Sequence, residues 1–373
     1  MKKIVYMDAA ASWLKNQSVI ESEVDFLTYS YANAGRGVCE RAANVDNMIL
    51  GVRQDVARFI GAKSSSNVIF TSGTTDGLNR IVNIIKNTLI FRNKKPVVAV
   101  SDLDHHSARM PWQALADTGW CDLVICPLDS DFNIDVKNIP LCDIFVITAM
   151  SNVLGIAQDV EQIIKKARKQ NPNVITIVDA AQFIAHNRID VSKFDCDFLC
   201  FSGHKIGADT GVGVMYIRNP DKFNPDKFGG GMVNKITKSG KWILNQSPEK
   251  FEAGTLPLTQ IVGLGKAIHQ LPSWYGSSKL INYMYNELAK IPSVKILTKS
   301  NACMLSFVVK DMHVLDFGVM VGTRGVCVRV GNMCASWIHQ KMGIDGSIRI
   351  SVGPWNTMAE AEHVIETIRK VAK

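Results

Sequence analysis

The 373-residue sequence lacks the features of several common protein classes. Its nine cysteines include no Cys-x-x-Cys pair, which argues against a zinc or iron–sulfur site. An odd number of scattered cysteines fits a reducing compartment, and we expect a cytoplasmic location. No apolar run reaches the length of a transmembrane helix, and the apolar stretch at the N-terminus is too short for a signal peptide.

Charge of one sign is also not concentrated in the chain. The net charge is +8, but the basic residues form no repeat with aromatic residues of the kind that tracks nucleic acid. We therefore expect neither a nucleic-acid nor a membrane partner. The hydrophobic fraction of 47% and the charged fraction of 20% are typical of a soluble globular enzyme. The chain is too long to fold around one small hydrophobic core, and we therefore predict two domains, 1–270 and 271–373.

Strand-like and helix-like segments alternate through the first two-thirds of the chain. Strands are expected at 67–72, 96–101, 123–127, 144–148, 174–179, 198–201 and 211–217. Helices are expected at 75–86, 106–116, 159–168 and 259–270. Nearly continuous apolar strands separated by helices indicate an α/β fold with a mostly parallel sheet covered on both faces. Residues 223–251 are predicted to form a long functional loop, and the chain beyond residue 270 has an α+β pattern.

Two of the predicted buried strands lead into residues that suit one cofactor. Lys205 follows the strand at 198–201 through a Ser-Gly-His turn, and Asp179 ends the strand at 174–179. A lysine amine can form a Schiff base, and a carboxylate can keep a pyridinium nitrogen protonated. Together they predict a pyridoxal 5'-phosphate (PLP) site, whereas either residue alone would carry little meaning.

The segment 71–77 joins a strand to a helix and is built from small and hydroxyl-bearing residues. Free backbone N–H groups and the start of a helix favour a phosphate at such a junction. An ordinary helix capped by Thr74 or Thr75 is the alternative.

Two other strand ends carry polar side chains. His105 can stack on an aromatic cofactor, flank a helix or bind a metal, and metal is the weakest of these because no third ligand is evident. The amide of Asn152 can contact a phenolic oxygen or a substrate carboxylate, although a turn role would be the default for Asn152 alone.

The C-terminal third offers a candidate nucleophile. Cys334 lies beside a glycine in a stretch without strong helix or strand signals, and Arg329 lies five residues before it. A thiolate is a nucleophile that a nearby guanidinium stabilises. Arg349 lies in a strand-like stretch, where its fork of donors can hold a carboxylate. For the other eight cysteines we expect core positions.

These stretches resemble the PLP-dependent cysteine desulfurases of the class V aminotransferase family. The resemblance extends from residue 6 almost to the C-terminus and rests on motifs in the family's order. They are Tyr6-Met7-Asp8-Ala9-Ala10-Ala11-Ser12, Thr74-Thr75-Asp76-Gly77-Leu78-Asn79, His105-His106 with Pro111-Trp112-Gln113, Ser151-Asn152-Val153-Leu154-Gly155, Val178-Asp179-Ala180-Ala181-Gln182, Phe201-Ser202-Gly203-His204-Lys205 and Phe251-Glu252-Ala253-Gly254-Thr255. The short span between Cys334 and Arg349 resembles the group II, sulfur-mobilisation type. The resemblance implies PLP fold type I, with a large parallel-sheet domain and a smaller α+β C-terminal domain.

The resemblance also implies roles for matching residues. The cofactor would be held by Lys205 as the Schiff-base lysine, Asp179 at the ring nitrogen, His105 stacked on the ring, Gln182 and Asn152 near the phenolic oxygen, and Thr74, Thr75, Ser202 and His204 at the phosphate. Thr255 would reach the phosphate of the neighbouring subunit, which implies a homodimer. Asn152, Arg329 and Arg349 would bind the substrate.

The implied reaction converts L-cysteine to L-alanine, with the sulfur transferred to Cys334 as a persulfide. Lys205, Cys334 and His105 would be the catalytic residues. An acceptor protein would then take the sulfur for uses such as iron–sulfur cluster assembly.

The chain departs from the group II pattern around the nucleophile. It has Gly35 where relatives carry a histidine before Arg36-Gly37, and Asn332-Met333 where they often carry two histidines. These departures keep a second reading open, a selenocysteine lyase or cysteine-conjugate lyase that needs Lys205 but not Cys334. A non-catalytic scaffold would have lost the lysine or the phosphate cradle, and neither is lost.

Overall fold

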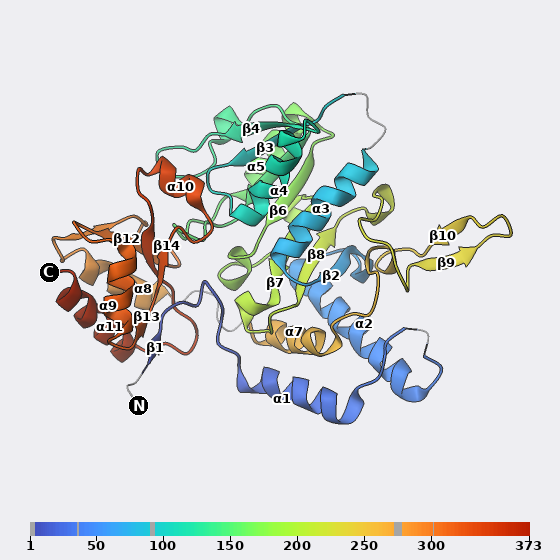
Figure 1. Cartoon of the computed structure of the whole chain (residues 1–373), viewed down its shortest axis with the longest axis horizontal. Coiled ribbons are helices and arrows are strands. Elements are labelled where there is room, and N and C mark those ends of the chain that lie inside the picture. Colours follow the sequence, from blue (N-terminus) through green and yellow to red (C-terminus); the bar gives the residue numbers. More distant parts are fainter. Residues whose placement is uncertain (1–3, 36, 90–93, 272–277, 301) are drawn as a thin grey trace.

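The computed structural model describes residues 4–35, 37–89, 94–271, 278–300 and 302–373, so Arg36 of the motif before Gly37 lies outside the described residues. Its centre is a seven-stranded sheet with the order β2-β8-β7-β6-β5-β3-β4 (Figure 1). The strands are β2 (Val68–Thr71), β3 (Val97–Ser101), β4 (Asp122–Cys126), β5 (Ile144–Thr148), β6 (Ile175–Asp179), β7 (Phe198–Ser202) and β8 (Gly213–Ile217). Each predicted strand is therefore confirmed within two residues at either end.

The sheet is mostly parallel, as the apolar runs predict. The pairs β4–β3, β3–β5, β5–β6 and β6–β7 are parallel, and β8 runs antiparallel to β7 and β2. All five residues of β5, β7 and β8 are buried. Burial of every position requires apolar layers on both faces, which explains why these strands lack an alternating polar pattern.

Two helical layers cover the sheet. On one face, α3 (Thr74–Thr88) and α4 (His106–Asp117) pack Leu78, Ile81 and Trp112 against strand side chains. On the other face lie α2 (Glu40–Ile60), α5 (Val160–Gln170), the short α6 (Val191–Phe194) and α7 (Leu258–Gln270). Helix α1 (Gln17–Asp25) packs on α7. Among the described residues, no helix combines the length and apolarity needed to cross a membrane.

A second, four-stranded antiparallel sheet has its own apolar core. Its order is β11 (Val294–Ile296), β12 (Leu305–Val309), β15 (Ser347–Ile350) and β14 (Arg329–Gly331). Helices α8 (Ser278–Leu288), α9 (Val314–Gly322) and α11 (Met358–Val371) contribute to this core. The N-terminal strand β1 (Val5–Tyr6) pairs with β13 (Val326–Cys327), so the start of the chain lies against its C-terminal part. The helix α10 (Ser336–Lys341) lies beside α4 (Figure 1).

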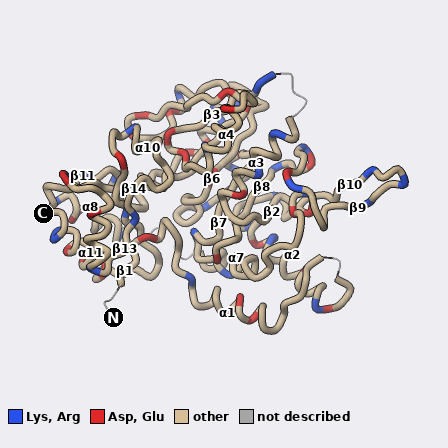
Figure 2. The backbone as a smooth tube through the Cα atoms, in the orientation of Figure 1, with Lys and Arg blue, Asp and Glu red and all other residues tan. Residues whose placement is uncertain are grey.

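The structure corrects two parts of the predicted layout. Residues 223–251 are not only a loop, because β9 (Val233–Ile236) and β10 (Trp242–Leu244) form an antiparallel hairpin. The hairpin projects from the body of the molecule and carries basic residues (Figure 2). Helix α2 was not among the predicted elements, although its buried residues recur with helical spacing at Ala42, Val45, Ile49, Val52, Val56 and Ile60.

Candidate active site

A cavity of about 330 Å3 lies at the carboxyl ends of the parallel strands. Thr148, Asp179 and Ser202 are the last residues of β5, β6 and β7, and all three line it. Ligands of open α/β sheets bind at this edge. Twelve of the thirteen predicted site residues line the cavity: Thr74, Thr75, His105, Asn152, Asp179, Gln182, Ser202, His204, Lys205, Arg329, Cys334 and Arg349. Thr255, the thirteenth, lies in a separate groove beside Arg53 and Glu252.

Lys205 is half-buried in the turn after β7. Burial lowers its pKa to about 8, with a further contribution from Arg349, while Asp179 acts in the opposite direction. Burial also raises the pKa of Asp179 to about 6, which still leaves the carboxylate ionised at neutral pH. An amine that is partly neutral near pH 8 is suited to nucleophilic and base chemistry.

The carbonyl of Ala10 holds the lysine. Lys205 Nζ donates to Ala10 O at 2.6 Å, and Gln182 Nε2 donates to the same oxygen at 2.8 Å. Ala10 belongs to the N-terminal segment, which reaches the cavity because Ala9 and Ala10 bond to Ser351 in the C-terminal part. The Gln182 amide nitrogen is thus directed at a backbone oxygen in this structure.

The start of α3 forms a compact cradle at one end of the cavity. Gly73, with φ of 146°, is the N-cap, so neither Thr74 nor Thr75 caps the helix. Thr74 N donates to Ser202 Oγ at 2.7 Å, and Thr75 Oγ1 lies 2.8 Å from Ser107 Oγ. Hydroxyls gathered at a helix N-terminus favour an anion.

The cradle depends on close backbone approach between two glycines. A Cβ on Gly213 of β8 would lie 2.6 Å from the Cα of Gly73 and 2.7 Å from Phe201 O. These contacts are with backbone, which cannot move aside as a side-chain tip can. Position 213 therefore requires glycine if the turn before α3 is to keep its place.

The two histidines of the cradle's surroundings are neutral. His105 is the N-cap of α4, and its Nδ1 accepts a hydrogen bond from Ser107 N at 3.1 Å. Burial lowers its pKa to about 4, so the ring proton is on Nε2. Burial also lowers the pKa of His204 to about 4, and its Nδ1 lies 3.4 Å from Ser12 Oγ.

Asp8 bridges two arginines at the other end of the cavity. Its Oδ1 accepts from Arg349 Nη2 at 3.0 Å, and its Oδ2 lies 2.6 Å from Arg329 Nη2. Arg349 Nη1 also donates to Asn152 O at 2.8 Å, whereas Arg349 Nε is buried and has no hydrogen-bond partner among the described residues. A buried donor without a partner is costly, and a bound carboxylate would satisfy it.

Cys334 is an exposed thiol in the wall of this cavity. It follows β14 and Met333, whose carbonyl accepts from Asn152 Nδ2 at 2.8 Å. The nine cysteines all lie within the described residues and all are free thiols, and Cys121, Cys126, Cys142, Cys196 and Cys200 are buried. Core positions are wrong for Cys39, which is exposed, and for Cys303 and Cys327, which are half-buried.

Some residues of the site were not predicted. Asp8 and Ala10 lie in a motif noted in the sequence, but their contacts join residues far apart in the chain. Ser107 lies two residues after His105 and touches both the His105 ring and the Thr75 hydroxyl. Ser107 lies in the first turn of a helix, two residues after a histidine, and this position could have indicated from the sequence that it belongs to the site.

The chain is similar to known proteins over nearly its whole length. The model of the family described as aminotransferase class-V matches residues 5–364. The cysteine desulfurase of Wigglesworthia glossinidia brevipalpis is 33% identical, with 99% of this chain and 93% of the relative covered. The probable cysteine desulfurase of Borreliella burgdorferi is 33% identical, with 100% and 92% covered. The apo structure of the cysteine desulfurase from Thermococcus onnurineus NA1 has a TM-score of 0.92 at 29% sequence identity. The match covers 99% of this chain and 94% of the Thermococcus chain. The chain belongs to the aminotransferase class-V family.

Proposed function

We propose that this protein is a PLP-dependent cysteine desulfurase that converts L-cysteine to L-alanine and retains the sulfur on Cys334. One observation carries the proposal: a half-buried lysine of lowered pKa and an exposed thiol line the same cavity. The curated relatives named cysteine desulfurase, with which the chain aligns over its whole length, support the same activity.

The residues of the cavity fit PLP. Lys205 would carry it, Asp179 would face its ring nitrogen, and the cradle at the start of α3 would take its phosphate. His105, Asn152, Gln182, Thr74, Thr75, Ser202 and His204 would complete the binding site. When bound, PLP supplies an electron sink for charge that develops at the substrate α-carbon.

The two arginines would orient the amino acid. The Nε of buried Arg349 would donate to the substrate carboxylate, and the half-exposed Arg329 would add a second positive charge. Asp8 holds both guanidinium groups and limits their movement. With the carboxylate fixed, Lys205 Nζ as the neutral amine would accept the Cα proton and would return it to Cα when L-alanine forms.

Cys334 would perform the sulfur step. Its thiolate attacks Sγ of L-cysteine, an S–S bond forms, and the Cβ–Sγ bond breaks with its electron pair left on Cβ. Cβ takes up the proton that the substrate thiol gave up. The balanced result is L-alanine and a Cys334 persulfide anion, with no external oxidant or reductant.

We further infer that the chain acts as a homodimer with a large domain at 1–270 and a small domain at 271–373. Thr255 lies outside the cavity of its own chain, as a residue that serves a neighbouring subunit would. The short span from Cys334 to Arg349 supports a group II enzyme that passes sulfur to an acceptor protein. Cytoplasmic location and a role in iron–sulfur cluster assembly belong to the same proposal.

Replacement of the nucleophile tests the activity. Cys334→Ala is expected to stop sulfur release from L-cysteine while PLP stays bound, because the thiol makes no contact that holds the cofactor residues. Cys39→Ala, another exposed cysteine, serves as the matched control and is expected to match the wild type. Unchanged turnover of L-cysteine by Cys334→Ala would contradict the proposal, and turnover of selenocysteine or a cysteine conjugate alone would favour the lyase reading.

A further inference from the structure

The loop that carries Cys334 has a backbone conformation that needs external support. Met333 and Cys334 have φ angles of 52° and 54°, which lie in the left-handed region that residues other than glycine rarely adopt. Residues held there cost about 1–3 kcal/mol each and persist only where surrounding contacts fix them.

Hydrogen bonds restrain each peptide of this loop. Cys334 N donates to Asn332 Oδ1 at 3.2 Å, and Ala335 N donates to Asn332 O at 2.9 Å. Asn332 therefore caps the turn from within the loop. The carbonyl of Cys334 accepts from the backbone N–H of His106 at 2.7 Å, a bond to a different part of the fold.

The His106 side chain makes a second bond to the same loop. Its Nε2 accepts from Ser336 N at 3.2 Å and lies 3.1 Å from Ser336 Oγ. Burial lowers the pKa of His106, which keeps the ring neutral and Nε2 free to accept. The proton of the neutral ring then lies on Nδ1.

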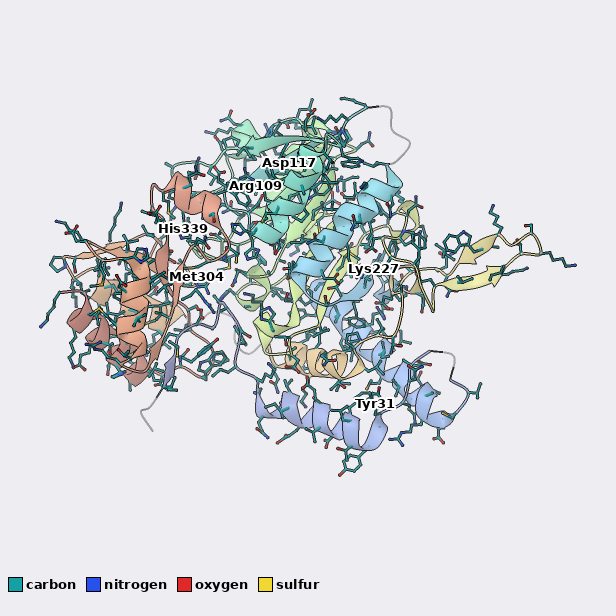
Figure 3. All side chains as sticks on the ribbon, in the orientation of Figure 1. Tyr31, Arg109, Asp117, Lys227, Met304 and His339 are labelled. Carbon is teal, nitrogen blue, oxygen red and sulfur yellow. The ribbon has the colours of Figure 1, made fainter. Side chains whose placement is uncertain are left out.

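Aromatic contacts support the orientation of this histidine. The ring of Trp337 packs edge-on against His106 at 5.2 Å, and Arg109 lies over the Trp337 ring at 4.1 Å. Arg109 lies on the side of α4 that faces α10 (Figure 3). Asp102 accepts from Arg109 at 3.2 Å and lies 3.5 Å from Lys341 of α10. The start of α4 and the Cys334 loop are thus joined at several points.

We propose that His106 is a positioning residue that fixes the Cys334 sulfur relative to the ring-facing His105. Two consecutive residues at the start of α4 have different tasks: His105 lines the cavity, and His106 binds the loop at the Cys334 carbonyl and at Ser336. The inference rests on the proposed desulfurase function and deepens it. The loop that carries the Cys334 thiol is bound to the start of α4, so the position of the sulfur is set by these contacts.

In the full-length, PLP-loaded enzyme, one variant can remove the side-chain bond alone and a second can remove both bonds. His106→Leu removes the side-chain acceptor, and His106→Gln keeps an acceptor at similar reach. His106→Pro also removes the backbone donor to Cys334 O. Proline is tolerated because residue 106 is the first residue of α4 and His105 has ψ of 150°. Gln17→Pro is the matched control, since the exposed Gln17 begins α1 after an extended Asn16.

The measurement is the single-turnover rate of persulfide formation on Cys334, read beside the KM for L-cysteine. His106→Leu is expected to slow this rate about 3- to 10-fold with KM unchanged, the size of one lost hydrogen bond. His106→Gln is expected to restore it to within about 2-fold, and His106→Pro to slow it further, by about 10- to 100-fold. Gln17→Pro is expected to match the wild type.

Wild-type rates in both His106→Leu and His106→Pro would overturn the positioning role. So would an equal loss in His106→Leu and His106→Gln, or a rise in KM without a change in rate. If His106→Pro does not fold, the comparison of His106→Leu with His106→Gln still decides the matter. Absence of persulfide in the wild-type enzyme would instead overturn the proposed desulfurase function itself.

Discussion

At the residue scale, the site depends on burial of charged groups near one another. Asp179 and Arg349 are buried and Lys205 is half-buried, and burial shifts each pKa in the direction that favours the neutral form of the group. The sequence identified the lysine and the aspartate because each lies at the end of an apolar strand. It did not reveal the Ala10 carbonyl or the Asp8 bridge, because those contacts join residues that are distant in the chain.

The lowered pKa of Lys205 predicts how PLP capture depends on pH. Only the neutral amine attacks the cofactor aldehyde, so the capture rate of the apo-protein should rise with pH and level off above a midpoint near 8. The measurement is the rate at which the visible absorbance of bound PLP appears between about pH 6 and about pH 10. A rate that keeps rising toward the usual lysine pKa of 10.5 would show that burial does not act as inferred. Lys205→Ala should give no bound band at any pH.

At the element scale, strands and their ends were more predictable than helices and hairpins. The strands of the large sheet are fully apolar and bounded by polar turns, which makes them visible in the sequence. The β9–β10 hairpin is short and largely exposed, so no apolar run marks it. The pairing of β1 with β13 is also hidden, because the pairing of two-residue strands depends on tertiary contacts.

The contact between β8 and the start of α3 predicts the effect of one added methyl group. Gly213→Ala should push Gly73 from its place, lower the free energy of unfolding by about 1–3 kcal/mol and weaken PLP retention. Gly51→Ala is the matched control, because no atom lies within 4 Å of the added Cβ in the α2 interior. It should raise the free energy of unfolding by about 0.5–1 kcal/mol. Denaturant unfolding and PLP content after gel filtration measure both effects, and equal behaviour of the two variants would refute the close-packing argument.

At the scale of the whole molecule, the N-terminal segment connects the two sheets. It pairs with β13, passes the cavity at Ala10 and continues into α1 beside α7. The cavity is therefore lined by residues from the beginning, middle and end of the chain. In the sequence these residues belong to separate motifs. That they share one site could be predicted only from the resemblance to a known family in which the motifs occur in the same order.

The proposed role of Thr255 predicts a homodimer. Sedimentation equilibrium should give a mass twice that of the 41.1 kDa chain, since a residue predicted to contact the neighbour's phosphate serves no purpose in a monomer. Thr255→Ala should then lower PLP affinity without changing the persulfide chemistry of the loaded enzyme. A fully active monomer would rule out shared sites.

The most direct test of the account is a single turnover of the PLP-loaded enzyme with one equivalent of L-cysteine. The account predicts one equivalent of L-alanine and one added sulfur atom on the peptide that contains Cys334, both absent in Cys334→Ala. L-alanine formed without sulfur on Cys334, or equally fast in Cys334→Ala, would contradict the claim that this thiol is the nucleophile.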